Sequence, residues 1–314
     1  MRVAIVGLGP MGLRHVHAWA RLSPPPQLAA LVRHDRDAAR LHDAPFVQHL
    51  ADMEQLQNFQ PDLTIVAVAT PDHFAVAAGL PGALLVEKPL CQTPDQAQTL
   101  LARSGRVFVG HTSRAEAGAI ALHRVIAQGV VGAAQAISIA GVEPALQRPG
   151  AGVPQHAGRL CDVLVHALAL AVELVPAADA TTVATALQLG PEGPQLQTAL
   201  QWPNGQRLQV AVAAHGQAGR HVHVSGERGA LSWDVLPGHS QLTLQVDRAP
   251  SPLPCGGPAP LVALADHIAA ALPTHQPTPF DGAWGLRVLQ LCGQIWAAVP
   301  AEQLAGGWQW SWLR

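Results

Sequence analysis

The chain has no tyrosine and a single lysine. Lysine and arginine together number 19 among 314 residues, and all of them except Lys88 are arginines. Without tyrosine, dehydrogenase chemistry in which a tyrosine hydroxyl donates the proton is excluded. A chain that uses arginine almost everywhere is expected to keep a lysine where an ammonium is needed and a guanidinium would not serve. Lys88 is therefore the first candidate for chemistry.

Charge and cysteine are also scarce. Charged residues make up 13% of the chain and the formal net charge is −2, with no block of like charges. This composition predicts neither a nucleic-acid partner nor an anionic membrane partner. The cysteines are far apart and form no CxxC pair, which favours reduced thiols over a disulfide framework or a zinc knuckle. We expect a cytoplasmic protein that acts on a small molecule.

The length predicts two domains, because one core rarely grows beyond about 250–300 residues. In residues 1–113, apolar runs of strand length alternate with helical stretches. The runs cover 2–7, 27–32, 63–69, 83–87 and 106–110. This alternation predicts an α/β domain with a doubly wound parallel sheet, the Rossmann arrangement.

Residues 114–314 have a different pattern. Six strand-like stretches follow closely between residues 181 and 247, with no room for crossover helices, and another covers 134–142. Helices are predicted over 115–128, 159–175, 261–272 and 281–298, a hairpin turn over 202–205 and a surface loop over 249–260. We expect an α+β domain with an open, mostly antiparallel sheet. Trp308, Trp310 and Trp312 alternate in the tail, which is typical of an edge strand, with or without a subunit contact.

A GxGxxG motif follows the first predicted strand and begins the first helix. Its candidate cofactor-binding residues are Gly7, Gly9, Pro10, Met11 and Gly12. Glycines there allow a tight turn and the close approach of a pyrophosphate to the helix N-terminus. The position of the motif in a βαβ unit predicts dinucleotide binding.

The end of the second strand bears on the choice of dinucleotide. The strand runs into Arg33 and His34, and an arginine there favours the 2′-phosphate of NADP. Asp35 is the alternative, because a carboxylate at this place binds the ribose hydroxyls of NAD. We expect NADP, with NAD as the open alternative.

Two further motifs end neighbouring strands. Thr70, Pro71 and His73 follow the strand at 63–69. Glu87 ends the strand at 83–87, and Lys88 directly follows it. Ligands of doubly wound sheets bind at the carboxyl ends of the strands, so these residues are expected at the cofactor site. Proline after Lys88 also allows a cis peptide bond.

Asp162 and His166 are four residues apart in an apolar helix and therefore share one face. A carboxylate beside an imidazole fixes its tautomer and raises its basicity, which suits general acid/base catalysis. A purely structural pair would have the same spacing. His156 offers a third metal ligand, but nothing fixes such a site, and we predict no metal.

Together these residues resemble the glucose-fructose oxidoreductase, inositol dehydrogenase and rhizopine catabolism (Gfo/Idh/MocA) family. The resemblance covers GLGPMGLRH (7–15), VATPDH (68–73), VEKPL (86–90), VGHTSR (109–114), GRLCDVLVH (158–166) and VSGERGALSWD (224–234). It implies that His166 is the acid/base, that Asp162 supports it and that Lys88 binds the substrate oxygen. It also implies that Arg114 contacts the substrate and that the open sheet forms a homodimer or homotetramer.

The chain also departs from the family pattern. Ala169 replaces the last aspartate of the helix motif, Ala157 its first glycine, and Ala75 a histidine that often follows the TP element. We therefore expect an NADP-preferring dehydrogenase or reductase that acts on a CH–OH group of a sugar, polyol or cyclic alcohol. The alternatives are reduction of a C=N or conjugated double bond, and a non-catalytic nucleotide-binding sensor or assembly subunit.

Overall fold

The structure is a computed structural model that describes residues 1–32, 39–103, 105–143, 153–177, 179–190, 193–246, 249–274 and 276–304. The chain packs into two compact units. The first comprises Met1–Ala115 and Pro258–Leu289, and the second comprises Glu116–Gly257 and Gln290–Arg314. The sequence pattern predicts one boundary, near residue 113, with residues 258–289 in the second domain. In the structure these residues return to the first unit.

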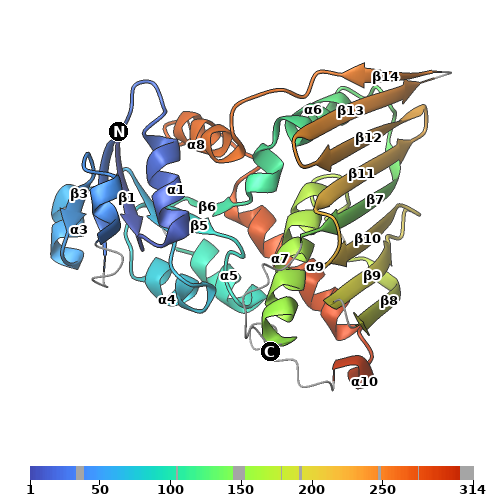
Figure 1. The fold of residues 1–314 in the computed structure, drawn as a ribbon, viewed down its shortest axis with the longest axis horizontal. Coiled ribbons are helices and arrows are strands. Elements are labelled where there is room, and N and C mark those ends of the chain that lie inside the picture. Colours follow the sequence, from blue (N-terminus) through green and yellow to red (C-terminus); the bar gives the residue numbers. More distant parts are fainter. Residues whose placement is uncertain are drawn as a thin grey trace. The chain divides into compact units, whose positions relative to one another are not determined.

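The first unit is built on six parallel strands in the order β3-β2-β1-β4-β5-β6 (Figure 1). The strands are β1 (Arg2–Val6), β2 (Gln27–Leu31), β3 (Gln48–Leu50), β4 (Leu63–Val66), β5 (Ala83–Glu87) and β6 (Val107–Gly110). The helices are α1 (Pro10–Trp19), α3 (Met53–Phe59), α4 (His73–Ala78), α5 (Pro94–Leu101), α8 (Pro260–Ala271), the first part of α9 (Gly282–Ala297), and the 3-10 turns η1 (Ala39–Asp43), η2 (Thr70–Asp72) and η3 (Thr112–Ala115). This strand order confirms the predicted Rossmann sheet.

Both faces of this sheet are covered, as continuous apolar strands require. Val3 and Ile5 of β1 belong to one core cluster, together with residues of α1 and α8. Ala4 and Val6 belong to the other, with residues of α3, α4 and α5. The short β3 was not predicted, because the sequence QHL carries no apolar run.

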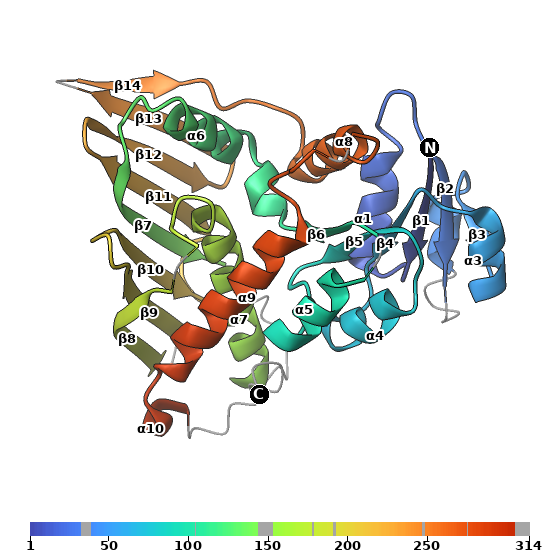
Figure 2. The ribbon, with the colours of Figure 1, turned by 180° about the vertical axis from the view of Figure 1, so that it is seen from behind.

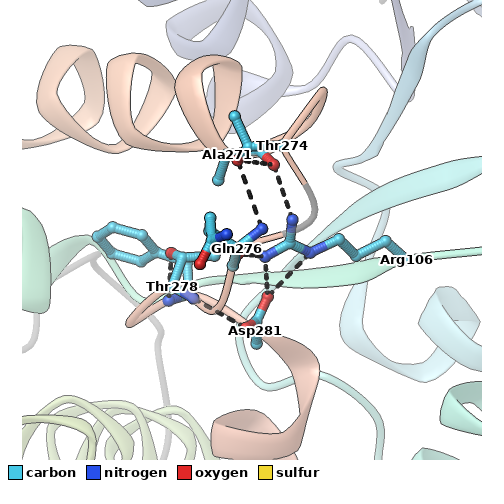
Figure 3. A network of polar contacts seen from close by, with 7 residues as sticks. Arg106, Ala271, Thr274, Gln276, Thr278 and Asp281 are labelled. Atoms are coloured by element: carbon cyan, nitrogen blue, oxygen red, sulfur yellow. Dashed lines mark hydrogen bonds and ion pairs between the residues drawn. The ribbon is translucent and has the colours of Figure 1, made fainter.

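Arg106 holds the returning segment to the sheet (Figure 3). Its guanidinium donates to the Ala271 carbonyl at 2.8 Å and to the Gln276 carbonyl, and it forms an ion pair with Asp281 at 2.9 Å. The second Asp281 oxygen accepts from the Thr278 N–H at 2.9 Å. One side chain directly before β6 thus binds the end of α8 and the turn before α9.

The second unit contains an eight-stranded sheet in the order β14-β13-β12-β11-β7-β10-β9-β8. Its strands are β7 (Ala134–Val142), β8 (Thr181–Gly190), β9 (Gly193–Gln201), β10 (Arg207–Ala213), β11 (Gly219–Gly226), β12 (Gly229–Leu236), β13 (His239–Val246) and β14 (Pro250–Leu253). Its helices are α6 (Ala117–Ala127), α7 (Val153–Ala171), α10 (Ala301–Leu304) and the second part of α9. Neighbouring strands are antiparallel except β7 and β10. This confirms the mostly antiparallel sheet.

Helices α6 and α7 pack on one face of this sheet, and among the described elements none covers the opposite face (Figures 1 and 2). The contact with α6 is close, because a Cβ on Gly118 would come within 2.1 Å of the Trp233 indole nitrogen. Burial alternates along the strands accordingly, as in β10, where Leu208, Val210 and Val212 are buried. One face is therefore a packed core and the other is open.

Three details of this unit bear on the predictions. The turn predicted at 202–205 joins the antiparallel strands β9 and β10, and Gly205 has the positive φ of +85° that it needs. Residues 249–260 were predicted to be a loop, but β14 forms there as an edge strand, the place where prolines are tolerated. The helix that carries Asp162 begins at Val153 instead of residue 159, because Pro154 is compatible with a first helical turn.

Candidate functional site

The glycine-rich loop between β1 and α1 leaves no room for a larger side chain at Gly7 or Gly12. Gly7 has φ of +92°, and a Cβ on Gly12 would lie 2.0 Å from the Gly7 carbonyl oxygen. Gly9, the N-cap of α1, has no side-chain cap, and nothing lies within 4 Å of the place where its Cβ would be. The first N–H groups of the helix therefore face an open cradle, which suits a pyrophosphate.

A basic side chain that the sequence analysis did not single out contacts this loop. Arg40 of η1 donates from Nη1 to the Leu8 carbonyl at 3.1 Å. The residues predicted to distinguish NADP from NAD (Arg33, His34 and the alternative Asp35) lie outside the described residues. Arg40 belongs to no recognisable motif. Its position soon after the second strand is the one sequence signal that could have identified it as a neighbour of the loop.

Glu87 fixes the backbone on the N-terminal side of Lys88. Its Oε1 lies 2.7 Å from His15 Nε2 in α1, and its Oε2 accepts from the Lys88 N–H at 3.3 Å. His15 and Glu87 are 0% and 5% exposed, so this pair is shielded from solvent. A Cβ on Gly110 would lie 2.8 Å from Glu87 Oε1, which explains why β6 ends in glycine.

His73 fixes the backbone on the C-terminal side of Lys88. Its Nδ1 lies 2.8 Å from the Pro89 carbonyl and its Nε2 lies 3.2 Å from the Val68 carbonyl. The Lys88–Pro89 peptide is cis. Burial lowers the pKa of His73 below its usual 6.5, against the opposing effects of the Pro89 carbonyl and the Glu87 charge. The neutral imidazole that burial favours has one N–H, so it donates to one of these two carbonyls, of which that of Pro89 lies closer.

The other predicted residues lie on different elements. Asp162 and His166 are half-buried, one turn apart on α7 of the second unit, among fully buried neighbours such as Leu164. Arg114 of η3, in the first unit, is buried, and its guanidinium lies 5.5 Å from the centre of the Trp284 ring. Arg114 is therefore packed against an aromatic face.

The first unit therefore brings three predicted motifs to the carboxyl ends of β1, β4 and β5. These are the loop of Gly7 to Gly12, Thr70 to His73, and Glu87 with Lys88. His15 links the first motif to the third, and the sequence analysis assigned it no role although it ends the GLGPMGLRH stretch. Within the described part of the chain, no three histidine, cysteine or acidic side chains are arranged to hold a metal ion.

Residues 1–110 match the family described as "GFO_IDH_MocA: Oxidoreductase family, NAD-binding Rossmann fold". The Rossmann domain of the chain thus matches the Gfo/Idh/MocA oxidoreductase family. The family resemblance predicted from the motifs is thus confirmed. None of the described helices is long and apolar enough to cross a membrane.

Individual family relatives are more distant. An inositol 2-dehydrogenase from Pseudarthrobacter chlorophenolicus is 33% identical over 143 residues, which cover 40% of this chain and 41% of that protein. The match thus spans less than half the length of this curated relative.

Two solved structures share the fold over nearly the whole chain. The UDP-N-acetylglucosamine 3-dehydrogenase from Acidithiobacillus ferrooxidans has a TM-score of 0.80 and 21% identity, and the match covers 96% of this chain and 99% of that one. The aldose-aldose oxidoreductase from Caulobacter crescentus has a TM-score of 0.79 and 17% identity, with coverages of 95% and 97%. At these identities the likeness establishes the two-unit fold.

Proposed function

We propose that the protein is an NAD(P)-dependent oxidoreductase that acts on a CH–OH group, or the corresponding carbonyl, of a sugar, polyol or cyclic alcohol. The observation that carries this proposal is the position of Lys88. The only lysine of the chain lies at the carboxyl edge of the Rossmann sheet, and its backbone is held on one side by Glu87 and on the other by His73. Such rigid placement is what a group that stabilises developing charge requires.

The residues have distinct roles in this proposal. When bound, a nicotinamide dinucleotide supplies the hydride acceptor or donor. The Lys88 ammonium donates a hydrogen bond to the substrate oxygen and stabilises its negative charge as it develops. His166 takes the proton from the hydroxyl or returns it to the carbonyl, and Asp162 orients the imidazole. Arg114 contributes to the substrate side of the site.

The cofactor fits the residues present. The uncapped N-terminus of α1 suits a pyrophosphate, and Arg40 adds positive charge beside the loop. Together with Arg33 and His34, Arg40 favours the additional phosphate of NADP. We propose NADP as the preferred cofactor.

The names of the relatives support the substrate class. An inositol, an amino sugar nucleotide and aldoses each carry secondary hydroxyl groups, and these are the compounds after which the three relatives are named. We further propose that the open face of the second unit's sheet forms the contact between subunits.

Replacement of Lys88 tests the proposal. A panel of inositols, aldoses, nucleotide sugars and cyclic ketones is screened with NADP and NAD, and turnover is followed through NAD(P)H absorbance. Lys88→Met is expected to lower kcat/KM by about 10²–10³-fold. His166→Ala is expected to remove the limb of the pH–rate profile that reports the base. Lys88→Met with turnover within a few-fold of the wild type would contradict the role of the lysine.

Ala169 favours a second substrate class for the same screen. Ala169 is fully buried in α7. Because its side chain is a methyl group, the helix offers no carboxylate at this position for polyol hydroxyls. Imines and conjugated enones therefore belong in the panel. Tight nucleotide binding without turnover of any compound would instead favour the sensor or assembly subunit.

A further inference from the structure

The first unit contains a cavity of about 530 Å³ that the proposed reaction does not use. Its lining includes residues at or directly before the first residues of β1, β4, β5 and β6, which are Met1, Asp62, Ala83 and Arg106. Because these strands are parallel, the cavity lies at the amino edge of the sheet, whereas cofactors of such sheets bind at the carboxyl edge. Its volume is in the range of about 300–1,000 Å³ that is typical of small-molecule sites.

The floor of this cavity is apolar. It consists of Ala83 of β5, Ala269 of α8 and Leu272 directly after α8. All three are partly buried and pack against the core cluster of the first unit, so each side chain faces the core on one side and the cavity on the other. Gly82 adds open space beside the floor, because nothing lies within 4 Å of the place where its Cβ would be. Such a surface suits the apolar part of a small molecule.

The two charged side chains of the cavity differ in what they can offer a ligand. The Arg106 guanidinium is neutralised by Asp281 at 2.9 Å and also donates to two backbone carbonyls (Figure 3). Asp62 is exposed, and its Oδ2 accepts from the Arg2 N–H at 2.7 Å. Within the described ranges, no donor binds its Oδ1 and no cation pairs with the carboxylate. The cavity therefore combines an apolar floor with one available negative charge.

From this combination we propose that the cavity binds a small organic amine, whose apolar ring or chain lies on the floor and whose ammonium group pairs with Asp62. The ammonium donates to the available oxygen and is attracted by the charge, whereas an anionic ligand is repelled. Since Asp62 is exposed, the ion pair adds only modestly to the apolar contact. A ligand with one ring and one amine is expected to bind with a Kd of about 1 mM.

The ligand of this cavity is an effector and not the substrate. Each of the four strands that begin here has four or five residues. At about 3.3 Å per residue, the amino and carboxyl edges of the sheet are about 13–17 Å apart. A small amine at the amino edge therefore does not reach the glycine-rich loop or Lys88.

Saturation-transfer-difference NMR of the full chain with phenethylamine tests the site. The wild type is expected to bind this amine saturably, and phenylacetate, which carries a carboxylate on a similar ring, is expected not to bind. Asp62→Asn keeps an acceptor for the Arg2 N–H but removes the charge, and should weaken binding of the amine about fivefold. Ala269→Leu fills the floor and should weaken it at least tenfold.

Asp266→Asn and Ala270→Leu are the matched controls, because both positions are exposed on α8 and neither lines the cavity. Both should leave binding of phenethylamine unchanged, and circular dichroism of every variant verifies that it is folded. Equal affinity of the amine for the wild type, Asp62→Asn and Ala269→Leu would overturn the proposal, as would binding of phenylacetate as tight as that of the amine. The measurement uses no nucleotide, so its outcome is independent of the proposed oxidoreductase activity.

Discussion

At the scale of single residues, the side chains around Lys88 explain how the backbone that carries this flexible side chain is held in place. Its N–H is bound by Glu87, and the carbonyl of the following proline is bound by His73. Both partners are buried, and Glu87 is itself held by His15 at 2.7 Å. The clamp thus consists of polar groups whose removal has a measurable cost.

Glu87→Ala is expected to lower the free energy of unfolding by about 3 kcal/mol, because it leaves His15 Nε2 buried without an acceptor. Glu87→Gln keeps the size and one acceptor oxygen, so its expected loss is about 1 kcal/mol. Urea denaturation of both variants measures the difference. An alanine variant as stable as the wild type would mean that the pair with His15 does not stabilise the fold.

The lowered pKa of His73 makes a prediction about pH. The unfolded chain takes up a proton near pH 6.5, whereas the buried ring resists protonation. The stability that His73 contributes is therefore present above about pH 6.5 and is lost as the pH falls toward the lowered pKa of the folded state. His73→Asn keeps an N–H donor for the Pro89 carbonyl but does not titrate.

Denaturation at about pH 7.5 and about pH 5.5 checks this sign. The wild type is expected to lose more stability between the two values than His73→Asn does. Equal losses would show that another group causes the acid sensitivity.

The sequence pattern singles out candidate residues but does not predict the contacts that hold them. Lys88 is a candidate because it is the only lysine, and the loop of Gly7 to Gly12 is one because its spacing is distinctive. His15 and Arg40 were not assigned, because a contact across 72 residues, such as that of His15 with Glu87, leaves no local pattern. The tertiary fold alone brings such partners together.

At the scale of elements, Arg106 connects β6 with the end of α8 and the turn before α9. It binds two carbonyls and one carboxylate (Figure 3). Arg106→Gln is expected to lower the free energy of unfolding by about 2 kcal/mol, because these bonds to a charged group are lost together. Denaturation of this variant beside Arg21→Lys, a change at an exposed arginine, measures the effect. Equal stability of the two variants would contradict the role of Arg106.

Strands with a clear apolar pattern were predicted well, and strands without such a pattern were missed. β5 and β7 occur at the predicted residues because their apolar patterns are continuous or alternating. β3 has three residues and β14 contains two prolines, so neither has the pattern of a strand. Both pair at or near the edge of a sheet, where the neighbouring strand decides whether they form.

At the scale of the whole molecule, the first unit is made from two separate parts of the chain. Leu264 and Ile268 of α8 belong to the same buried cluster as Ile5 and Trp19. The sequence did not predict this return, because the apolar pattern of the helices at 260–297 would suit packing on the sheet of either domain. Composition and periodicity identify a helix but do not choose the sheet on which it packs.

The return makes a prediction about fragments. Residues 1–115 alone are expected to unfold without cooperativity, because one face of their sheet lacks the cover of α8. The same fragment joined by a flexible linker to residues 258–289 is expected to melt cooperatively. Thermal denaturation followed by circular dichroism compares the two. Equal melting of both fragments would show that the returning segment is dispensable for the first unit.

The central claim, that the glycine-rich loop binds a nicotinamide dinucleotide, is tested most directly by paired titrations with NADPH and NADH. Quenching of tryptophan emission reports binding to the wild type and to Gly12→Ala, whose added Cβ would lie 2.0 Å from the Gly7 carbonyl oxygen. The account predicts binding of both nucleotides, NADPH about tenfold more tightly, and weaker binding to Gly12→Ala. Tighter binding of NADH would move the cofactor preference to NAD and keep the claim. Binding of neither nucleotide, or equal binding to the variant, would contradict it.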